Sequence, residues 1–556
     1  MNPQTMNSAT PLLAAGGRPW PAEAAAAYRR DGYWTGERLD RIAEAAIRAT
    51  PDHPAVVDDH GQLSYAELGA RISRLAAVFS HRGLTDRDRV ILQLPNRIEL
   101  VVCALALMRI GAIPVYCLGS SRERELTAVA DRAKAVALIV GDMTADYDAA
   151  RVAADVVEQV ASARWVMTAE QLRSASITGR ELEQTYRVSG TDDIAFLQLS
   201  GGTTGLPKLI PRTHDDYLYS IRRSNVVCGL TPQDVFLSVI PAVHNFPMSS
   251  PGFLGVLLAG GTVVLTEDQL PGAVFDLVAL HRVTVVPLVP PLAHLWVNHA
   301  ELEPDAIGQL SSLRLLQVGG AKLVPELARR LMELVPGTLQ QVFGMAEGLV
   351  CYTRPDDDAD TVIGTQGRPM SAADEIRIVD EQDRPVASGH RGHLLTRGPY
   401  TIRGYFRSPE ANRQAFTEDG FYRTGDIVRQ RADGSLIVEG RSKDQINRGG
   451  EKISAEEVED ILLAHPAIDD AVVVAEPDEY LGERSVAIIV PARAGTSANS
   501  GVDRKSIASH LRDCGVDVMK VPDRIETTEQ FPVTGVGKIS RVRLRTLLRE
   551  QRSTNA

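Results

Sequence analysis

The chain has 556 residues, of which 44% are hydrophobic and 24% are charged, and it carries a formal net charge of −11. A chain of this length exceeds what one hydrophobic core supports, so at least two domains are expected. The composition is typical of a globular protein, and the negative charge argues against nucleic acid or an anionic membrane as the main partner.

Three features of the sequence indicate the cellular location of the protein: the N-terminus, one apolar segment and the cysteines. The first 20 residues lack a basic segment followed by an apolar run, so they do not resemble a signal peptide. Residues 100–118 are apolar but interrupted by Arg109, Gly111 and Pro114, which favours a buried helix, turn and strand over a membrane span. The five cysteines are not spaced as in metal sites or disulfide frameworks: Cys103, Cys117, Cys228, Cys351 and Cys514. This spacing favours free thiols in a cytoplasmic protein.

Helices and apolar strands alternate over the first two thirds of the chain. Helical periodicity over 37–48 is followed by a second helix that begins after a Ser64 cap. Helix, turn and apolar strand then recur in three segments: 105–115, 255–265 and 277–287. This alternation predicts an α/β fold with doubly wound, mostly parallel sheets covered on both faces.

The pattern changes after about Gly367. Strand-like segments with polar alternation and many turns predict a β-rich subdomain: 375–379, 393–397 and 435–438. Alternating helices and strands from 454 to about 548 predict a last α+β unit with a flexible loop at 494–501. We therefore expect a large N-terminal domain over 1–440, a hinge over 441–444 and a small mobile C-terminal domain over 445–556.

The strongest local signal for chemistry is the segment LSGGTTGLPK, residues 199–208. It follows a predicted apolar strand, and its glycines let backbone N–H groups approach phosphate oxygens while its hydroxyls add donors. It is not a Walker A loop, because the GK[ST] ending is absent and Pro207 precedes Lys208. By itself the segment fits either a phosphate site or a flexible surface loop.

Four further segments join this loop in a fixed order: QVFGMAEG (341–348), YRTGD (422–426), GRSKD (440–444) and PVTGVGK (532–538). Together they resemble the motifs of the adenylate-forming superfamily, which comprises acyl-CoA synthetases, nonribosomal adenylation domains and luciferases. The resemblance extends from about residue 60 to 545. On these five motifs the chain is identified as a member of that superfamily.

The resemblance implies two cofactors, ATP and Mg²⁺. It implies ATP or AMP contacts from Ser200, Gly201, Gly202, Thr203, Thr204, Gly205, Lys208, Gly319, Gly320, Val342, Phe343, Gly344, Met345, Asp426 and Arg441. Asp426 would accept hydrogen bonds from the ribose hydroxyls, and Arg441 would support the ribose or phosphate side. Glu347 would help hold Mg²⁺, a hard cation that prefers carboxylate and phosphate oxygens.

Two lysines are implied to serve catalysis and domain movement. Lys538 would bridge the substrate carboxylate and the α-phosphate in the transition state, so the small domain must close over the large one. The family rotates that domain for its second half-reaction, and Lys443 occupies the pivot position. From the residues alone, a pivot and an ordinary linker lysine are equally supported at Lys443.

The segment HNFPMSSP (244–251), with VGGAKL (318–323) and VFGMAEGLV (342–350), resembles most closely the stand-alone aryl-acid–AMP ligases of siderophore pathways. Those enzymes use 2,3-dihydroxybenzoate or salicylate. The resemblance implies an aryl-acid pocket made of Asn245, Phe246, Ser250, Ala321 and Val350.

Some of these positions leave alternatives open. We expect Asn245 to hydrogen-bond a 2-hydroxyl, although a capping or turn asparagine beside Pro247 is also compatible. His244 matches a position beside the reacting carboxylate, and a structural histidine is equally compatible. Phe246 resembles the salicylate type whereas Ser250 and Val350 resemble the dihydroxybenzoate type, so the acid stays open between these two and substituted salicylates.

The chain offers no phosphopantetheine-bearing carrier module after Lys538, so the resemblance implies a separate aryl carrier protein as acyl acceptor. An aryl-CoA ligase that uses free coenzyme A is the first alternative. A catalytically silent nucleotide-binding scaffold is the second, and the presence of Glu347, Asp426 and Lys538 argues against it. A P-loop kinase or ATPase is the third, and it would release ADP instead of AMP and pyrophosphate.

Overall fold

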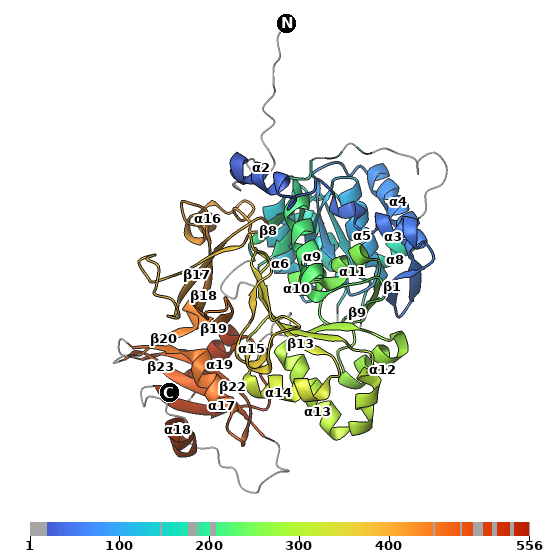
Figure 1. Cartoon of the computed structure of the whole chain (residues 1–556). Helices are drawn as coiled ribbons and strands as arrows, with labels where there is room; N and C mark the ends of the chain where they lie inside the picture. Colours follow the sequence, from blue (N-terminus) through green and yellow to red (C-terminus); the bar gives the residue numbers. More distant parts are fainter. Residues whose placement is uncertain are drawn as a thin grey trace.

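The structure is a computed structural model that describes residues 19–144, 147–175, 186, 188, 190–200, 207–448, 451–478, 481–492, 504–513, 520–533 and 539–554. Within these ranges, three sheets form the large N-terminal part and a fourth forms the small C-terminal part (Figure 1). The predicted fold class, a large α/β domain with a β-rich subdomain and a small α+β domain, is confirmed.

The largest sheet is predominantly parallel. Its nine strands lie in the order β15-β14-β13-β12-β11-β9-β10-β1-β2, and pairing is parallel from β13 to β1 and antiparallel at both edges. The strands are β1 (Pro54–Asp58), β2 (Gly61–Ser64), β9 (Val235–Ser238), β10 (Thr262–Leu265), β11 (Val285–Leu288), β12 (Leu315–Gly319), β13 (Thr338–Gly344), β14 (Val350–Tyr352) and β15 (Arg368–Pro369).

The second sheet has six strands in the order β6-β5-β3-β4-β7-β8, all parallel except for the β7–β8 pair. They are β3 (Arg89–Gln93), β4 (Ile113–Tyr116), β5 (Ala137–Val140), β6 (Trp165–Thr168), β7 (Ile194–Leu199) and β8 (Leu209–Thr213). Strand β8 lies at the edge of this sheet, and the described ends of the glycine-rich segment, residues 199–200 and 207–208, adjoin the antiparallel β7–β8 pair.

Helices cover both large sheets (Figure 1). They are α2 (Ala22–Arg30), α3 (Glu44–Ala49), α4 (Tyr65–His81), α5 (Ile98–Arg109), α6 (Glu123–Ala133), α7 (Ala149–Gln159), α8 (Ala169–Ser174), α9 (His214–Cys228), α10 (Asn245–Ser249), α11 (Gly252–Ala259), α12 (Pro271–His281), α13 (Pro290–Leu302), α14 (Pro325–Leu334) and α15 (Ala359–Gly364). Every residue of α5 from Ile98 to Met108 is buried, as its all-round apolar sequence predicts. Among the described residues, no helix is long and apolar enough to cross a membrane.

The start of the chain differs in one place from the sequence prediction. Ser64 caps α4 as expected, in a capping box with Glu67. The single helix predicted over 37–48 is instead a 3₁₀ turn at Leu39–Arg41 followed by α3. The Leu39 N–H donates to His214 Nδ1 and Arg38 donates to the Met108 carbonyl, so tertiary contacts hold the first turn outside α-helical geometry.

The β-rich subdomain is an antiparallel sheet of β16 (Glu375–Val379), β17 (Gly392–Arg397), β18 (Tyr422–Gln430) and β19 (Leu436–Arg441), with α16 (Pro409–Ala415) beside it. Its strands confirm the three predicted from polar alternation. A register shift accompanies Gly425, which has φ +76°, and the neighbouring Thr424 donates its hydroxyl to the Leu394 carbonyl. This irregularity changes the direction of the backbone at residue Asp426.

The small domain begins after a 3₁₀ turn, η4 (Ser442–Asp444), that coincides with the expected hinge. Its elements are β20 (Gln445–Arg448), β21 (Glu451–Ser454), α17 (Ala455–Leu463), β22 (Ile468–Asp478), β23 (Gly482–Pro491), α18 (Arg504–Asp513), β24 (Arg524–Thr527) and α19 (Arg541–Thr554). The loop predicted over 494–501 lies outside the described residues. The domain boundaries themselves stay a prediction.

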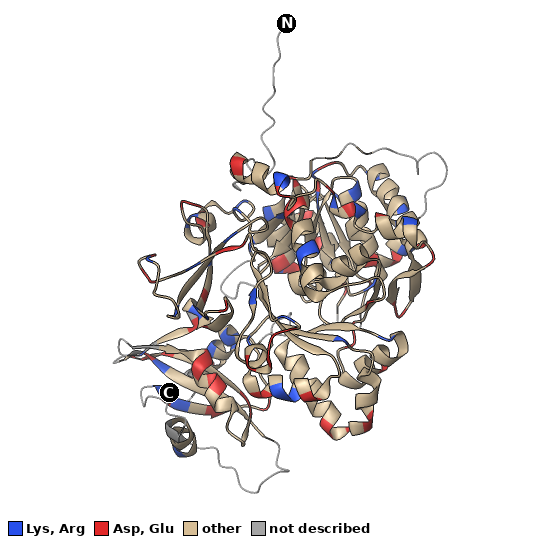
Figure 2. Ribbon diagram, in the orientation of Figure 1, with Lys and Arg blue, Asp and Glu red and all other residues tan. Residues whose placement is uncertain are grey.

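Helix α17, its N-cap residue and the start of strand β22 contact the large N-terminal part. The Lys322 ammonium lies 2.7 Å from Asp460 Oδ2, and His294 Nε2 lies 3.4 Å from Asp469 Oδ1. The Ser454 hydroxyl also donates to the Glu439 carbonyl at 2.7 Å. Acidic side chains gather on α17, whereas charges of both signs are interspersed over the rest of the ribbon (Figure 2).

The described cysteines are free, buried thiols. They are Cys103, Cys117, Cys228 and Cys351; Cys514 lies outside the described residues. Burial raises the pKa of each of these four thiols, to about 12 at Cys228. The prediction of free thiols therefore holds for the described cysteines.

Candidate active site

The expected site residues follow the carboxyl ends of three strands in the nine-stranded sheet. Residues 244–250 come after β9, Gly319 ends β12 and Gly320 follows it, and residues 345–347 continue from the end of β13 at Gly344. Parallel strands present their carboxyl ends at one edge, which is where ligands bind in open α/β sheets. The sheet therefore brings part of the expected acid pocket and part of the expected nucleotide residues to one edge.

Gly319 is the point where these two groups of residues meet. A Cβ added at position 319 would lie 2.6 Å from the Val342 carbonyl oxygen and 3.1 Å from the Phe246 ring. Only glycine leaves room for the ring at this place. Gly320 follows with φ +85°, and both Gly320 and Ala321 are exposed at the end of the strand.

Helix α10 carries the expected acid-binding side chains. His244 is its N-cap residue without a side-chain capping bond, and Asn245 is its first residue. The Tyr217 hydroxyl donates to Asn245 Oδ1 at 3.0 Å, and Ser249 Oγ lies 3.4 Å from the same oxygen. Asn245 Oδ1 thus accepts from side-chain hydroxyls, not from helix N–H groups, which argues against the capping alternative.

Two further expected pocket residues lie deeper. Ser250 is 2% exposed and Val350 is also 2% exposed. Tyr352 packs beside them, donates to Ser224 Oγ at 2.8 Å and interacts with the Ser250 hydroxyl. Burial raises the pKa of Tyr352 and these two serines lower it by less, so the phenol stays protonated at neutral pH.

Glu347 lies in a buried cluster of tyrosines. The Tyr405 hydroxyl donates to Glu347 Oε1 at 2.9 Å and lies 3.1 Å from the Tyr422 hydroxyl. Burial and then the Glu347 charge raise the pKa of both tyrosines. The Lys208 ammonium lies 4.7 Å from the centre of the Tyr405 ring, so the end of the glycine-rich segment reaches the same cluster.

Asp426 and Arg441 face each other across the β18–β19 hairpin. They are register partners, and Arg441 Nε lies 2.8 Å from Asp426 Oδ1. The carboxylate of Asp426 is 3% exposed whereas the Arg441 side chain is 44% exposed. The Asp426 carboxylate raises the pKa of Arg441, and the Glu347 carboxylate raises it further. The three charged groups therefore lie close enough to interact.

The ends of the glycine-rich segment are tied together. The Ser200 N–H donates to the Lys208 carbonyl at 2.9 Å, and the Lys208 N–H donates to Ser200 Oγ at 3.0 Å. Five expected phosphate-loop residues and the expected catalytic lysine lie outside the described residues: Gly201, Gly202, Thr203, Thr204, Gly205 and Lys538. The backbone of Lys443 lies in η4.

Sequence reasoning missed several polar side chains of this site. Tyr422 opens the YRTGD segment, so its position signalled it, but Tyr405 and Tyr217 lie in segments without a motif. Arg212 belongs to the stretch 211–214, which continues the resemblance of the glycine-rich segment, but its contacts were not predicted: it is fully buried, pairs with Asp216 and donates to the carbonyl of Ala346, the residue before Glu347. Only the fold brings these groups to the site.

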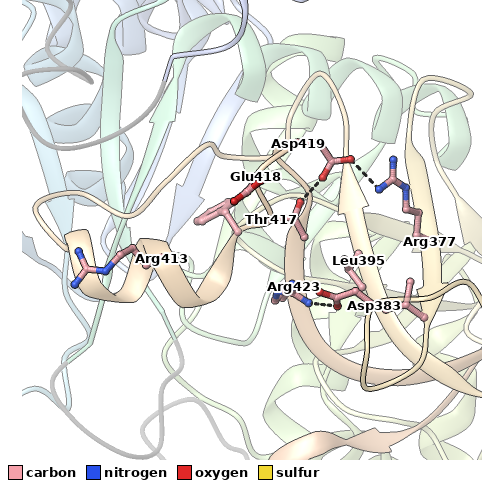
Figure 3. A pocket seen from close by; sticks show the side chains of 10 residues that line it. Arg377, Asp383, Leu395, Arg413, Thr417, Glu418, Asp419 and Arg423 are labelled. Carbon is pink, nitrogen blue, oxygen red and sulfur yellow. Dashed lines mark hydrogen bonds and ion pairs between the residues drawn. The ribbon is translucent and has the colours of Figure 1, made fainter.

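A separate pocket of about 460 Å³ lies in the β-rich subdomain beside α16 (Figure 3). Two of its three guanidinium groups pair with lining carboxylates, Arg377 with Asp419 and Arg423 with Asp383, and the third, on Arg413, lies 3.6 Å from Glu410. None of the expected site residues lines it. Because its charges are balanced internally, this pocket shows no preference for an anion.

Comparison with known families accounts for this arrangement. The model of the AMP-binding enzyme family matches residues 43–406, and the model of its C-terminal domain matches residues 457–538. The chain belongs to the AMP-binding enzyme family. The predicted membership of the adenylate-forming superfamily is confirmed.

Individual members of the AMP-binding family are similar over nearly the whole chain. The 2,3-dihydroxybenzoate-AMP ligase of Bacillus subtilis (strain 168) is 47% identical over 96% of this chain and 98% of its own length. The salicyl-AMP ligase / salicyl-S-ArCP synthetase of Mycobacterium tuberculosis is 45% identical over 94% of this chain and 93% of its own. The apo structure of Mycobacterium smegmatis MbtA is 42% identical, with a TM-score of 0.73 over 97% of this chain and 100% of that one.

Proposed function

We propose that this AMP-binding enzyme is an aryl-acid–AMP ligase. It activates a 2-hydroxylated benzoate, either salicylate or 2,3-dihydroxybenzoate, with ATP and then passes the acyl group to the phosphopantetheine thiol of a separate aryl carrier protein in siderophore assembly. ATP and a reduced thiol are cytoplasmic reagents, so the reaction belongs in the cytoplasm. The similarity to ligases of both acids over nearly the whole chain supports this substrate class.

The single observation that carries the proposal is the contact between Phe246 and Gly319. It joins the helix that bears Asn245 to the strand end that leads into the nucleotide residues. An aromatic acid bound beside Phe246 and Asn245 would therefore have its carboxylate directed towards the nucleotide side. Positioning of two reacting groups in this way supplies much of the rate of a bimolecular reaction.

In the first step, a carboxylate oxygen of the acid attacks the α-phosphorus of ATP. A new P–O bond forms, the bond from the α-phosphorus to the bridging oxygen breaks, and pyrophosphate leaves. Asp426 would accept from the ribose hydroxyls, and Arg441, now paired with Asp426, would turn towards the phosphate side. Lys208, and Lys538 from the small domain, would offset the repulsion between the two anions.

Glu347 fits a role in holding Mg²⁺. Tyr405 occupies Oε1 of this carboxylate, and the donor set is hard oxygen only. Among the described residues no group of three His, Cys, Asp or Glu side chains is placed to hold a metal. This suits an ion that takes most of its ligands from phosphates and water. When bound, Mg²⁺ would neutralise charge on the phosphates of ATP.

In the second step, a thiol sulfur attacks the acyl carbon, the acyl–phosphate bond breaks and AMP leaves. The small domain would rotate about the 441–444 segment, with Lys443 as the pivot, so that Lys538 leaves and the thiol enters. His244 precedes Asn245 at the start of α10, beside the expected position of the carboxylate.

Pyrophosphate exchange tests the proposal. Purified enzyme with ATP and Mg²⁺ should incorporate labelled pyrophosphate into ATP when salicylate or 2,3-dihydroxybenzoate is added, and far less with benzoate. Lys538→Ala should abolish the exchange while acyl transfer from supplied aryl-adenylate continues. Absence of exchange with every hydroxybenzoate would reject the function. Faster thioester formation with free coenzyme A than with an aryl carrier protein would move the assignment to an aryl-CoA ligase.

A further inference from the structure

Tyr217 is a fully buried residue of α9 whose hydroxyl reaches the expected acid pocket. Its ring packs edge-on against Phe196, with centroids 4.6 Å apart, and against the Arg212 guanidinium at 4.8 Å. Arg212 is itself fixed by Asp216 and two carbonyl groups. The phenol is therefore held rigidly, and it presents its hydroxyl to Asn245 from the core side.

The Tyr217 hydroxyl acts as a donor in this contact. Burial raises the pKa of the phenol, and the nearby Arg212 charge lowers it by less, so the proton stays on the oxygen. The Tyr217 hydroxyl donates this proton to Asn245 Oδ1 at 3.0 Å, whereas the Ser249 hydroxyl donates to the Asn245 backbone carbonyl at 3.1 Å and the Gln198 NH₂ group to the Val243 carbonyl at 3.3 Å.

This contact determines which end of the Asn245 amide faces the pocket. An amide has an acceptor oxygen and a donor NH₂ group at opposite corners. Oδ1 is engaged on the buried side by Tyr217, with Ser249 Oγ 3.4 Å away, whereas Asn245 itself is only half-buried. The NH₂ group is thereby left to the open side, and in a reversed amide the buried Tyr217 proton would lose this acceptor.

We propose that Tyr217 is a positioning residue that fixes Asn245 as a hydrogen-bond donor, and that the site consequently selects aromatic acids whose ortho substituent accepts a hydrogen bond. This inference rests on the proposed function. In salicylate the ortho hydroxyl donates internally to the carboxylate, and its oxygen lone pair is left to accept from Asn245 Nδ2. In anthranilate one N–H is used internally and the other points outwards, so it would meet the amide donor.

Tyr217→Phe tests the positioning role in steady-state pyrophosphate exchange. We expect kcat/KM for salicylate to fall about 10-fold, the effect of one misaligned hydrogen bond, while kcat/KM for benzoate changes less than about threefold. The ratio of salicylate to anthranilate should fall accordingly. Tyr116→Phe is the matched control, because Tyr116 is a buried tyrosine whose ring packs against the same Phe196. An unchanged salicylate-to-benzoate ratio in Tyr217→Phe would overturn the proposal.

Asn245→Asp provides a test that does not depend on the stability of the Tyr217 variant. One carboxylate oxygen would still accept from Tyr217, and the other would present an acceptor to the pocket. We expect the salicylate-to-anthranilate ratio of kcat/KM to fall about 100-fold. The hydrogen bond between residue 245 and the ortho substituent is lost with salicylate and gained with anthranilate. A ratio unchanged within about threefold would contradict a donor role for the amide.

Pyrophosphate exchange by the wild-type enzyme, compared with discrimination in the variants, distinguishes the ligase function from the role of Tyr217. Exchange with salicylate and loss of discrimination in the variants would support both the ligase function and the amide orientation. Exchange with salicylate but unaltered discrimination would leave the ligase function and remove the role of Tyr217. No exchange with any hydroxybenzoate would remove the ligase function, and this inference with it.

Discussion

At the scale of single residues, Gly319 lies where the expected acid pocket and the expected nucleotide residues meet at one edge of the sheet. The space above its Cα holds the Phe246 ring and the Val342 carbonyl oxygen. Both are parts of the expected site, so any side chain here must displace one of them. Backbone displacement in a packed region costs roughly 1–3 kcal/mol.

Gly319→Ala should therefore reduce adenylation strongly while most of the folded structure is preserved. We expect kcat/KM in pyrophosphate exchange to fall by about 10-fold or more, together with a drop in Tm of a few degrees. Gly364→Ala is the matched control, because a Cβ at that position meets nothing within 4 Å. Equal activity in the two variants would show that the Phe246 ring does not depend on Gly319.

Individual residues also show how far the sequence could predict the site. Motif order identified Glu347, Asp426 and Arg441, and the structure places them in one electrostatic neighbourhood. The same motifs did not indicate Tyr405, which contacts Glu347 across 58 positions of sequence, or Tyr217, which lies 28 positions from Asn245. Such partners depend on how distant strands and helices are stacked, and a local pattern carries no signal for that.

At the scale of elements, the periodicity of hydrophobic residues and the positions of turn residues predicted most helices and strands. In these elements the local conformational preference agrees with the tertiary packing. Helix α4 begins at its Ser64 capping box, and the segments around Gly111 and Gly260 turn from helix to strand as expected. The exception at Leu39–Arg41 arises from contacts to His214 and Met108, which override local periodicity.

Helix α17 carries a titratable group that makes its packing sensitive to pH. Burial raises the pKa of Glu456 to about 7, and its neighbours Glu459 and Asp460 oppose the charged form while Arg541 and Lys322 favour it. The folded protein keeps this proton to higher pH than the unfolded chain, whose carboxyl titrates near 4.5. The contribution of Glu456 to stability is therefore retained below that value and lost as pH rises to about 7.

Glu456→Gln should accordingly stabilise the protein at alkaline pH. The variant keeps a neutral group at this site, so we expect its free energy of unfolding at pH 8 to exceed that of the wild type by roughly 1–3 kcal/mol. The difference should vanish below pH 4.5, where both side chains are neutral. Denaturant unfolding at several pH values measures this. A constant difference across the range would contradict it.

At the scale of the whole molecule, the loop after β12 lies between the expected acid pocket and helix α17. Gly319 contacts Phe246, and three residues later Lys322 pairs with Asp460 on α17. Both charged side chains of this pair are partly buried, at 21% and 25% exposure. An ion pair of this kind is worth about 0.5–1 kcal/mol, enough to bias a domain orientation but not to lock it.

Reversal of one charge should consequently release the small domain from this orientation. In Asp460→Lys we expect a broader distribution of distances between fluorescent labels on the two domains, and in the double variant with Lys322→Asp a partial return to the wild-type distribution. The coupling energy from this cycle should be about 0.5–1 kcal/mol and should decrease at high salt. Identical distributions in all four proteins would show that other contacts set the domain position.

The four described thiols have a practical consequence for following the second half-reaction. A thiolate, not a thiol, reacts with chromogenic disulfides and maleimides, and burial suppresses the thiolate form at Cys103, Cys117, Cys228 and Cys351. These side chains will therefore add little background when such a reagent counts the sulfhydryl groups of an acceptor. In a Cys514→Ser variant, in which only these four thiols are left, consumption of pantetheine can be read directly as loss of colour.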